Sequence, residues 1–67
     1  MALSARNQLS GAVKSVVLGT VMAEVVVDVG GQEVVSAITR QAVENLDVKA
    51  GDEVRVIIKS TEVMIEK

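Results

Sequence analysis

Runs in which valine occupies every second position recur along this chain, and they constrain its fold more than any other feature. The sequence contains fifteen valines, four isoleucines and no proline, a composition that favours β-strands. In the first run Leu9, Val13 and Val17 fall on one parity, which predicts a strand with one buried and one wet face. The same reading predicts five strands in all, over residues 8–17, 21–29, 33–38, 53–59 and 62–65.

The period changes between the third and fourth predicted strands. Thr39 is a suitable N-cap, and residues 40–46 predict a short helix with Val43 and Leu46 facing the core. Gly30-Gly31 is a hairpin signal between the second and third strands. This order predicts an all-β fold, a five-stranded OB-like barrel with one short helix between strands three and four, forming a single domain over residues 1–67. The rival, an SH3-like barrel, lacks a helix of this length at that place.

The chain is short for a stable monomer, and this predicts self-association. A chain of this size buries only about 60% of its unfolded surface, and the sequence has neither cysteine nor aromatic residues to compensate. The outer faces of the predicted strands carry further apolar residues, namely Val26, Val35, Ala37, Ile57 and Met64. We expect other copies of the chain to cover them in a homo-oligomer. The alternative is that they are scattered surface residues, which are common in monomers.

Several function classes are disfavoured by what the sequence lacks. It has no histidine, no cysteine and no carboxylate cluster with metal-ligand spacing, so we expect neither an enzyme nor a protein that ligates a metal directly. A net charge of −2 argues against a nucleic-acid partner. No long apolar run or signal-peptide pattern is present, so we expect no membrane partner and a cytoplasmic protein.

One polar cluster stands out near the N-terminus, in the stretch Ser4-Ala5-Arg6-Asn7-Gln8-Leu9, which contains no acid. A tetrahedral oxyanion needs several donors, which an arginine fork, a lysine charge and hydroxyl groups supply. Further donors of these kinds occur at Thr39 and at Lys59-Ser60. Each also has a simpler explanation. The opening stretch would be a polar leader into the first strand, Thr39 a helix cap, and Lys59 a residue that keeps a strand edge soluble. Only convergence of these groups in space would make them a site.

The opening Ser4–Leu9 stretch resembles the molybdenum-pterin-binding proteins, or molbindins, as do Ser36-Ala37-Ile38-Thr39 and the Ile57–Ser60 segment. The resemblance covers nearly the whole chain and implies an OB-like, cytoplasmic protein that binds molybdate or tungstate through the oxygens of the anion. It also implies which residues bind the oxyanion, with Ala5 contributing its backbone amide. They are Ser4, Ala5, Arg6, Thr39, Lys59 and Ser60.

The resemblance further implies storage or buffering of the anion by a trimer of dimers with sites between subunits. Two positions depart from the family pattern: Met22 stands where many members have asparagine, and Ala42 where some regulator domains have serine. Without an aromatic side chain to stack on a pterin, no organic cofactor is expected. One alternative function is a structural or interaction module without a ligand. A less favoured alternative is a single-strand nucleic-acid-binding OB domain, which would lack its stacking aromatics.

Overall fold

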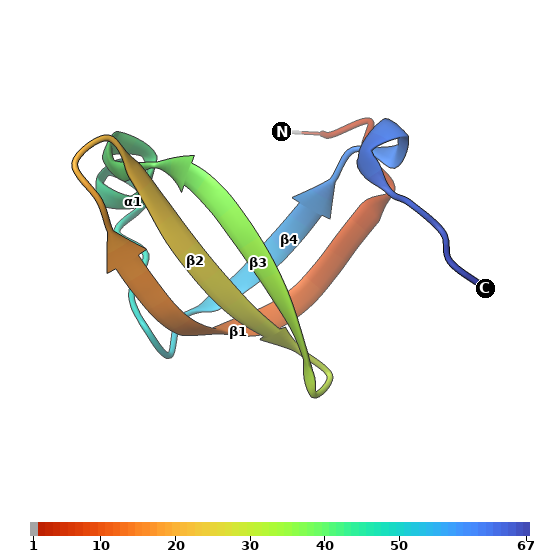
Figure 1. Cartoon of the computed structure of the whole chain (residues 1–67), viewed down its shortest axis with the longest axis horizontal. Helices are drawn as coiled ribbons and strands as arrows, with labels where there is room; N and C mark the ends of the chain where they lie inside the picture. The colour runs from red at the N-terminus through yellow and green to blue at the C-terminus, as the bar shows by residue number, and fades with distance from the viewer. Residues whose placement is uncertain (1) are drawn as a thin grey trace.

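The computed structural model describes residues 2–67 as a single bent sheet with one short α-helix (Figure 1). The sheet is antiparallel with strand order β3-β2-β1-β4. Figure 1 shows β4 and the first half of β1 running away from the rest of the sheet. The elements, in chain order, are β1 (Asn7–Leu18), β2 (Met22–Val29), β3 (Gln32–Thr39), α1 (Arg40–Leu46), β4 (Glu53–Ile58) and a 3-10 helix η1 (Ser60–Glu62).

Strand β1 pairs with two different strands along its length, and the sheet bends where it changes partner. Its first half pairs with β4 and its second half with β2, and Ala12 is opposite both Asp28 and Glu53. The projecting part of the molecule, residues 4–11 and 53–62, is called the arm below. The arm carries both the opening stretch and the end of β4, so β1 holds these two segments together.

A bulge in β1 overturns part of the predicted alternation. The pairing with β2 shifts between Val13 and Ser15, so Lys14 is an extra residue. An extra residue moves every later side chain to the opposite face. Val13 is therefore buried and Val16 packs against the core, whereas Val17 is 61% exposed, contrary to the prediction that it shares the face of Val13.

The core lies between the β1–β2–β3 part of the sheet and α1. It consists of small side chains, and none in the described chain is less than 2% exposed. The prediction that Val43 and Leu46 face the core is confirmed at Val43 but wrong at Leu46, which is 70% exposed because α1 ends there and residues 2–67 provide nothing to cover it. The buried residues are Val13, Ala23, Val25, Val27 and Val43.

The helix prediction is confirmed at both ends, and the hairpin prediction is confirmed by its backbone. Helix α1 spans the predicted residues and begins after Thr39. Gly30 and Gly31 have φ angles of 59° and 87°, the positive values that a tight hairpin turn between β2 and β3 requires. No helix within residues 2–67 is long and apolar enough to cross a membrane.

The predicted fifth strand is wrong for this chain, which has four strands within residues 2–67. The segment forms η1 and then an extended tail, and Figure 1 shows the tail leaving the end of the arm. A strand needs a neighbour with free backbone N–H and C=O groups, and η1 directs the chain away from the edge of β4. Met64 and Ile65 are consequently 93% and 88% exposed.

Candidate functional site

Three side-chain hydrogen bonds hold the opening stretch in place within the arm. Asn7 Nδ2 donates to the Ile58 carbonyl oxygen over 3.1 Å, and Gln8 Nε2 donates to the Ala5 carbonyl oxygen over 2.8 Å. Arg55 Nη1 on β4 donates to Gln8 Oε1 over 3.1 Å. These bonds hold the backbone around Ala5 against β4. The sequence pattern alone does not reveal this positioning role of Asn7, Gln8 and Arg55, and its only signal is the pair of adjacent amides.

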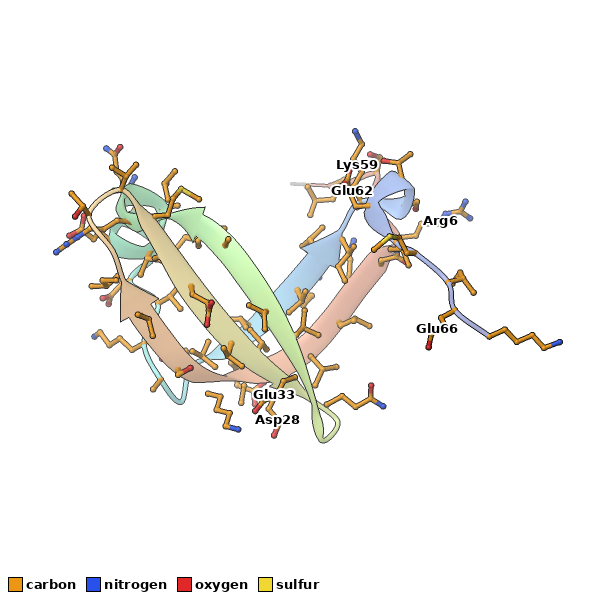
Figure 2. All side chains as sticks on the ribbon, viewed as in Figure 1. Arg6, Asp28, Glu33, Lys59, Glu62 and Glu66 are labelled. Carbon is orange, nitrogen blue, oxygen red and sulfur yellow. The ribbon has the colours of Figure 1, made fainter. Side chains whose placement is uncertain are left out.

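Antiparallel pairing brings the two predicted donor segments to the same end of the arm. Asn7 is opposite Ile58 in the last pair of the β1–β4 ladder, so Arg6 and Lys59 are the next residues beyond it. Figure 2 shows both side chains around η1 at the end of the arm, pointing in different directions. Ala5 is half-buried and the other members are exposed. The structure thus gathers five of the six predicted residues: Ser4, Ala5, Arg6, Lys59 and Ser60.

The two cations at this end have no ion pair within residues 2–67. The ion pairs in that part of the chain join Lys14 to Glu33, Arg40 to Glu44 and Lys49 to Asp47. Figure 2 places Glu62 and Glu66 at the same end of the molecule, on η1 and on the tail beyond it. Within residues 2–67, no carboxylate forms an ion pair with Arg6 or Lys59 that would compete with an anion.

The pKa of one lysine elsewhere in the chain is perturbed. The hydrogen bond from Lys14 to Glu33, together with the charge of Glu33, raises the pKa of Lys14 above its usual value. Because the folded-state pKa is raised, the pair stabilises the fold at pH values below the usual lysine pKa and stops doing so above the raised one. Both side chains are exposed, so the contribution to stability is small, and Figure 2 shows Glu33 beside the β2–β3 hairpin, away from the end of the arm where Arg6 and Lys59 lie.

Thr39 lies apart from the other five residues. It ends β3, opposite Met22 on β2, and Figure 1 shows this end of the sheet far from the end of the arm. Its Oγ1 accepts a hydrogen bond from the Ala42 backbone nitrogen over 3.0 Å, as the predicted N-cap. A single chain therefore does not bring all six predicted residues together.

A polar hollow of ≈ 430 Å³ adjoins Thr39. Its lining includes Thr20 and Arg40, and Arg40 is held by long contacts to the Gly19 carbonyl oxygen (3.4 Å) and to Glu44 (3.7 Å). Met22 pairs with Thr39 in the ladder, so this departure from the family pattern lies directly beside the hollow. Ala42 supplies the amide that Thr39 caps, and the backbone provides that amide whatever the side chain.

Removing the cap tests the structural role of Thr39 directly. We expect Thr39→Ala to lower the free energy of unfolding by about 1 kcal/mol, because the Ala42 amide loses its acceptor. Thr39→Ser keeps the hydroxyl and should retain most of the stability. Urea denaturation followed by circular dichroism measures both variants. If the alanine and serine variants have equal stability, the hydroxyl does not act as a cap.

No other chemistry is evident in the part of the chain that the structure describes. Residues 2–67 contain no group of three or more His, Cys, Asp or Glu side chains that could hold a metal ion. The arrangement at the arm offers donors and positive charge and no acid–base pair. Donors and positive charge of this kind are the groups that an oxyanion requires.

The comparisons with known proteins agree with this chemistry. The TOBE domain family pattern matches residues 3–65. Molybdenum-pterin-binding protein 3 from Clostridium pasteurianum is 52% identical over 66 residues, which cover 97% of each chain. A molybdate binding protein from Sporomusa ovata superposes with a TM-score of 0.96 at 46% identity, covering 100% of both chains. The cytoplasmic molybdate-binding protein ModG, solved with molybdate bound, superposes with a TM-score of 0.85 at 43% identity. The match covers 90% of this chain and 43% of the ModG chain.

Proposed function

The chain belongs to the TOBE domain family and is a close relative of the molybdenum-pterin-binding proteins, and from that premise we propose that it binds molybdate. The observation that carries the proposal is the end of the arm. Two cations without an ion pair in the described chain, Arg6 and Lys59, lie there beside the hydroxyl residues Ser4 and Ser60. Relatives that share this fold bind molybdate.

The donor set suits a doubly charged tetrahedral oxyanion. Arg6 offers a planar fork of N–H groups and Lys59 a compact positive charge, and the Ala5 amide adds a backbone donor. Tungstate has nearly the same size and charge, so the same donors would bind it. None of these groups acts as a nucleophile or a general base here, which favours binding and storage, or buffering, over catalysis. The arm thus provides a site that holds an anion without changing it.

A complete site needs two copies of the chain. Thr39 and the arm lie at opposite ends of one molecule (Figure 1), so a second copy would have to bring its arm to the first copy's Thr39. The register of β2 and β3 places Met22 and Val35 on the same outer face as Thr39, and both are largely exposed. This apolar face would be covered in a homo-oligomer, for which we propose the trimer of dimers, with molybdate between subunits in the cytoplasm.

Calorimetric titration tests the binding proposal. Molybdate added to the protein should release or absorb heat with saturation, and sulfate at the same concentration serves as the control anion. Because sites between subunits link binding to assembly, saturating molybdate should also stabilise the oligomer, by about 2.7 kcal/mol at a hundredfold excess over Kd. Absence of both heat and thermal shift would leave the alternative, a structural or interaction module without a ligand.

A further inference from the structure

Two neighbouring side-chain amides on β1 each bind a backbone carbonyl oxygen at the end of the arm. Asn7 Nδ2 donates to the Ile58 oxygen over 3.1 Å, and Gln8 Nε2 donates to the Ala5 oxygen over 2.8 Å. Both amide residues are half-buried. Successive residues of a strand project to opposite faces of its sheet, so these two bonds hold the end of the arm from both faces.

The two bound oxygens belong to the peptide groups that directly precede the cations of the arm. The nitrogen of the first peptide group, after Ala5, is that of Arg6, and the nitrogen of the second, after Ile58, is that of Lys59. A trans peptide group is planar, so its C=O and N–H point in opposite directions. Each amide side chain therefore directs one N–H group away from itself. The turn and side-chain hydrogen bonds of residues 2–67 include neither nitrogen as a donor.

Arg55 on β4 determines which end of the Gln8 amide faces Ala5. Its Nη1 donates to Gln8 Oε1 over 3.1 Å. The two side chains lie diagonally across the β1–β4 ladder, in which Arg55 is opposite Ser10. A guanidinium has donors only, so it keeps the amide oxygen towards itself and leaves Nε2 for the Ala5 oxygen. Arg55, Gln8 and the Ala5 carbonyl thus form one chain of hydrogen bonds.

We propose that Asn7 and Gln8 are positioning residues of the anion site, and that Arg55 acts there through Gln8. They turn two backbone carbonyl oxygens away from the anion and fix two N–H groups before it arrives. A carbonyl oxygen presents the negative end of a dipole to an anion, whereas an oriented N–H group attracts it. Neither side chain needs to touch the anion. The proposal rests on the proposed function, because it assigns roles at the same site.

Calorimetric titration with molybdate tests the role of Gln8. Gln8→Met removes the donor and the acceptor but keeps the length of the side chain, so we expect the Kd to rise roughly threefold to tenfold. Gln8→Glu keeps the acceptor for Arg55 but cannot donate, and it should weaken binding at least as much. The matched controls, Gln32→Met and Gln32→Glu, change an exposed glutamine at the start of β3 and should leave the Kd unchanged. Wild-type affinity in either Gln8 variant would overturn the proposal.

Nuclear magnetic resonance of the anion-free protein separates positioning from a general loss of stability. The ¹⁵N order parameter of the Arg6 amide should fall from a rigid value near 0.85 to below about 0.6 in Gln8→Met. The amides of Val25 and Val27 in the core should keep their wild-type values. An Arg6 amide that stays rigid would overturn the proposal whatever the affinity. If the wild type itself binds no molybdate, the proposed function fails, and the order parameters still show whether Gln8 holds this peptide group.

Asn7→Leu makes the corresponding test on the other side of the arm. Leucine has nearly the size of asparagine but no donor for the Ile58 oxygen. We expect a lower order parameter at the Lys59 amide and a Kd raised roughly threefold to tenfold. A rigid Lys59 amide or a wild-type Kd would show that Asn7 does not position this peptide group.

A double-mutant cycle tests whether Arg55 acts through Gln8. Arg55→Met alone should weaken molybdate binding by less than Gln8→Met, because Nε2 can still reach the Ala5 oxygen without the guanidinium. In a chain that already carries Gln8→Met, the same change should add little, since the group that Arg55 orients is gone. Effects that multiply in the double variant would show that Arg55 acts independently of Gln8, and this would overturn its place in the chain of hydrogen bonds.

Discussion

Replacing Arg6 by alanine should remove most of the rise in melting temperature that saturating molybdate gives the wild-type protein. Arg6 lies beyond the last pair of the β1–β4 ladder and has no ion pair in the described chain, so its guanidinium is available to the anion. Losing a hydrogen bond to a charged group costs roughly 1.5–3 kcal/mol, about ten- to a hundredfold in affinity. Titration calorimetry of wild type and variant measures the ratio of the two Kd values.

Two further variants separate the guanidinium fork from the charge. Arg6→Lys keeps the charge but loses the planar fork, so we expect an affinity between those of wild type and the alanine variant. Lys49→Ala changes the net charge of the protein by the same amount at a lysine that is paired with Asp47 outside the arm. It should leave the molybdate shift nearly intact. A full shift in Arg6→Ala would show that Arg6 is not a ligand.

The sequence alone predicts those features of the fold that depend on residues adjacent in the chain. The N-cap, helix and hairpin around Thr39 and Gly30-Gly31 were predicted because their signals are local in the chain. The bulge at Lys14 was missed because nothing in the strand pattern of β1 marks an extra residue. The position of that residue depends on how β1 pairs with β2, and the sequence of β1 alone does not show this pairing.

The prediction of a fifth strand was wrong for a different reason. Residues 62–65 alternate as a strand does, but alternation states only that a segment would fit a sheet, and within residues 2–67 no strand pairs with it. Leu46 was predicted to face the core, but it is exposed for the same reason, because no segment of residues 2–67 covers it. Both errors fall where a single copy of the chain, within residues 2–67, provides no neighbouring segment.

Some features of the candidate site also follow from the sequence, whereas others depend on the folded structure. The location of Arg6 and Lys59 at the same end of the arm follows from simple antiparallel pairing of β1 with β4, although the two residues are far apart in sequence. The anchoring bonds of Asn7 and Gln8 depend on side-chain geometry that residue spacing does not reveal. The separation of Thr39 from the arm depends on the bend of the whole sheet. A list of donors therefore names candidate residues but does not reveal that one chain brings only five of the six to the same place.

Gly11 lies close to β2 where β1 passes from β4 to β2, and we expect Gly11→Val to prevent stable folding. A Cβ atom at this position would lie 2.5 Å from the Asp28 carbonyl oxygen and 2.8 Å from Val27 Cγ1. The first contact is with backbone of β2, so a side-chain rotation cannot relieve it. Overpacking a well-packed core typically costs 1–3 kcal/mol, and forcing two paired strands apart affects many contacts at once. The core of this chain consists of five small buried residues, which leaves little stability to offset the loss.

Ala12→Val is the matched control, since it adds bulk at the next position of β1 on an exposed side chain. Its free energy of unfolding should stay within about 0.5 kcal/mol of the wild type. Far-UV circular dichroism and urea denaturation compare the two variants, and a wild-type midpoint for Gly11→Val would show that β1 and β2 need not approach so closely. Because Gly11 lies where β1 passes from β4 to β2, its loss should remove molybdate binding together with the fold. Arg6→Ala, in contrast, should remove binding from a chain that remains folded.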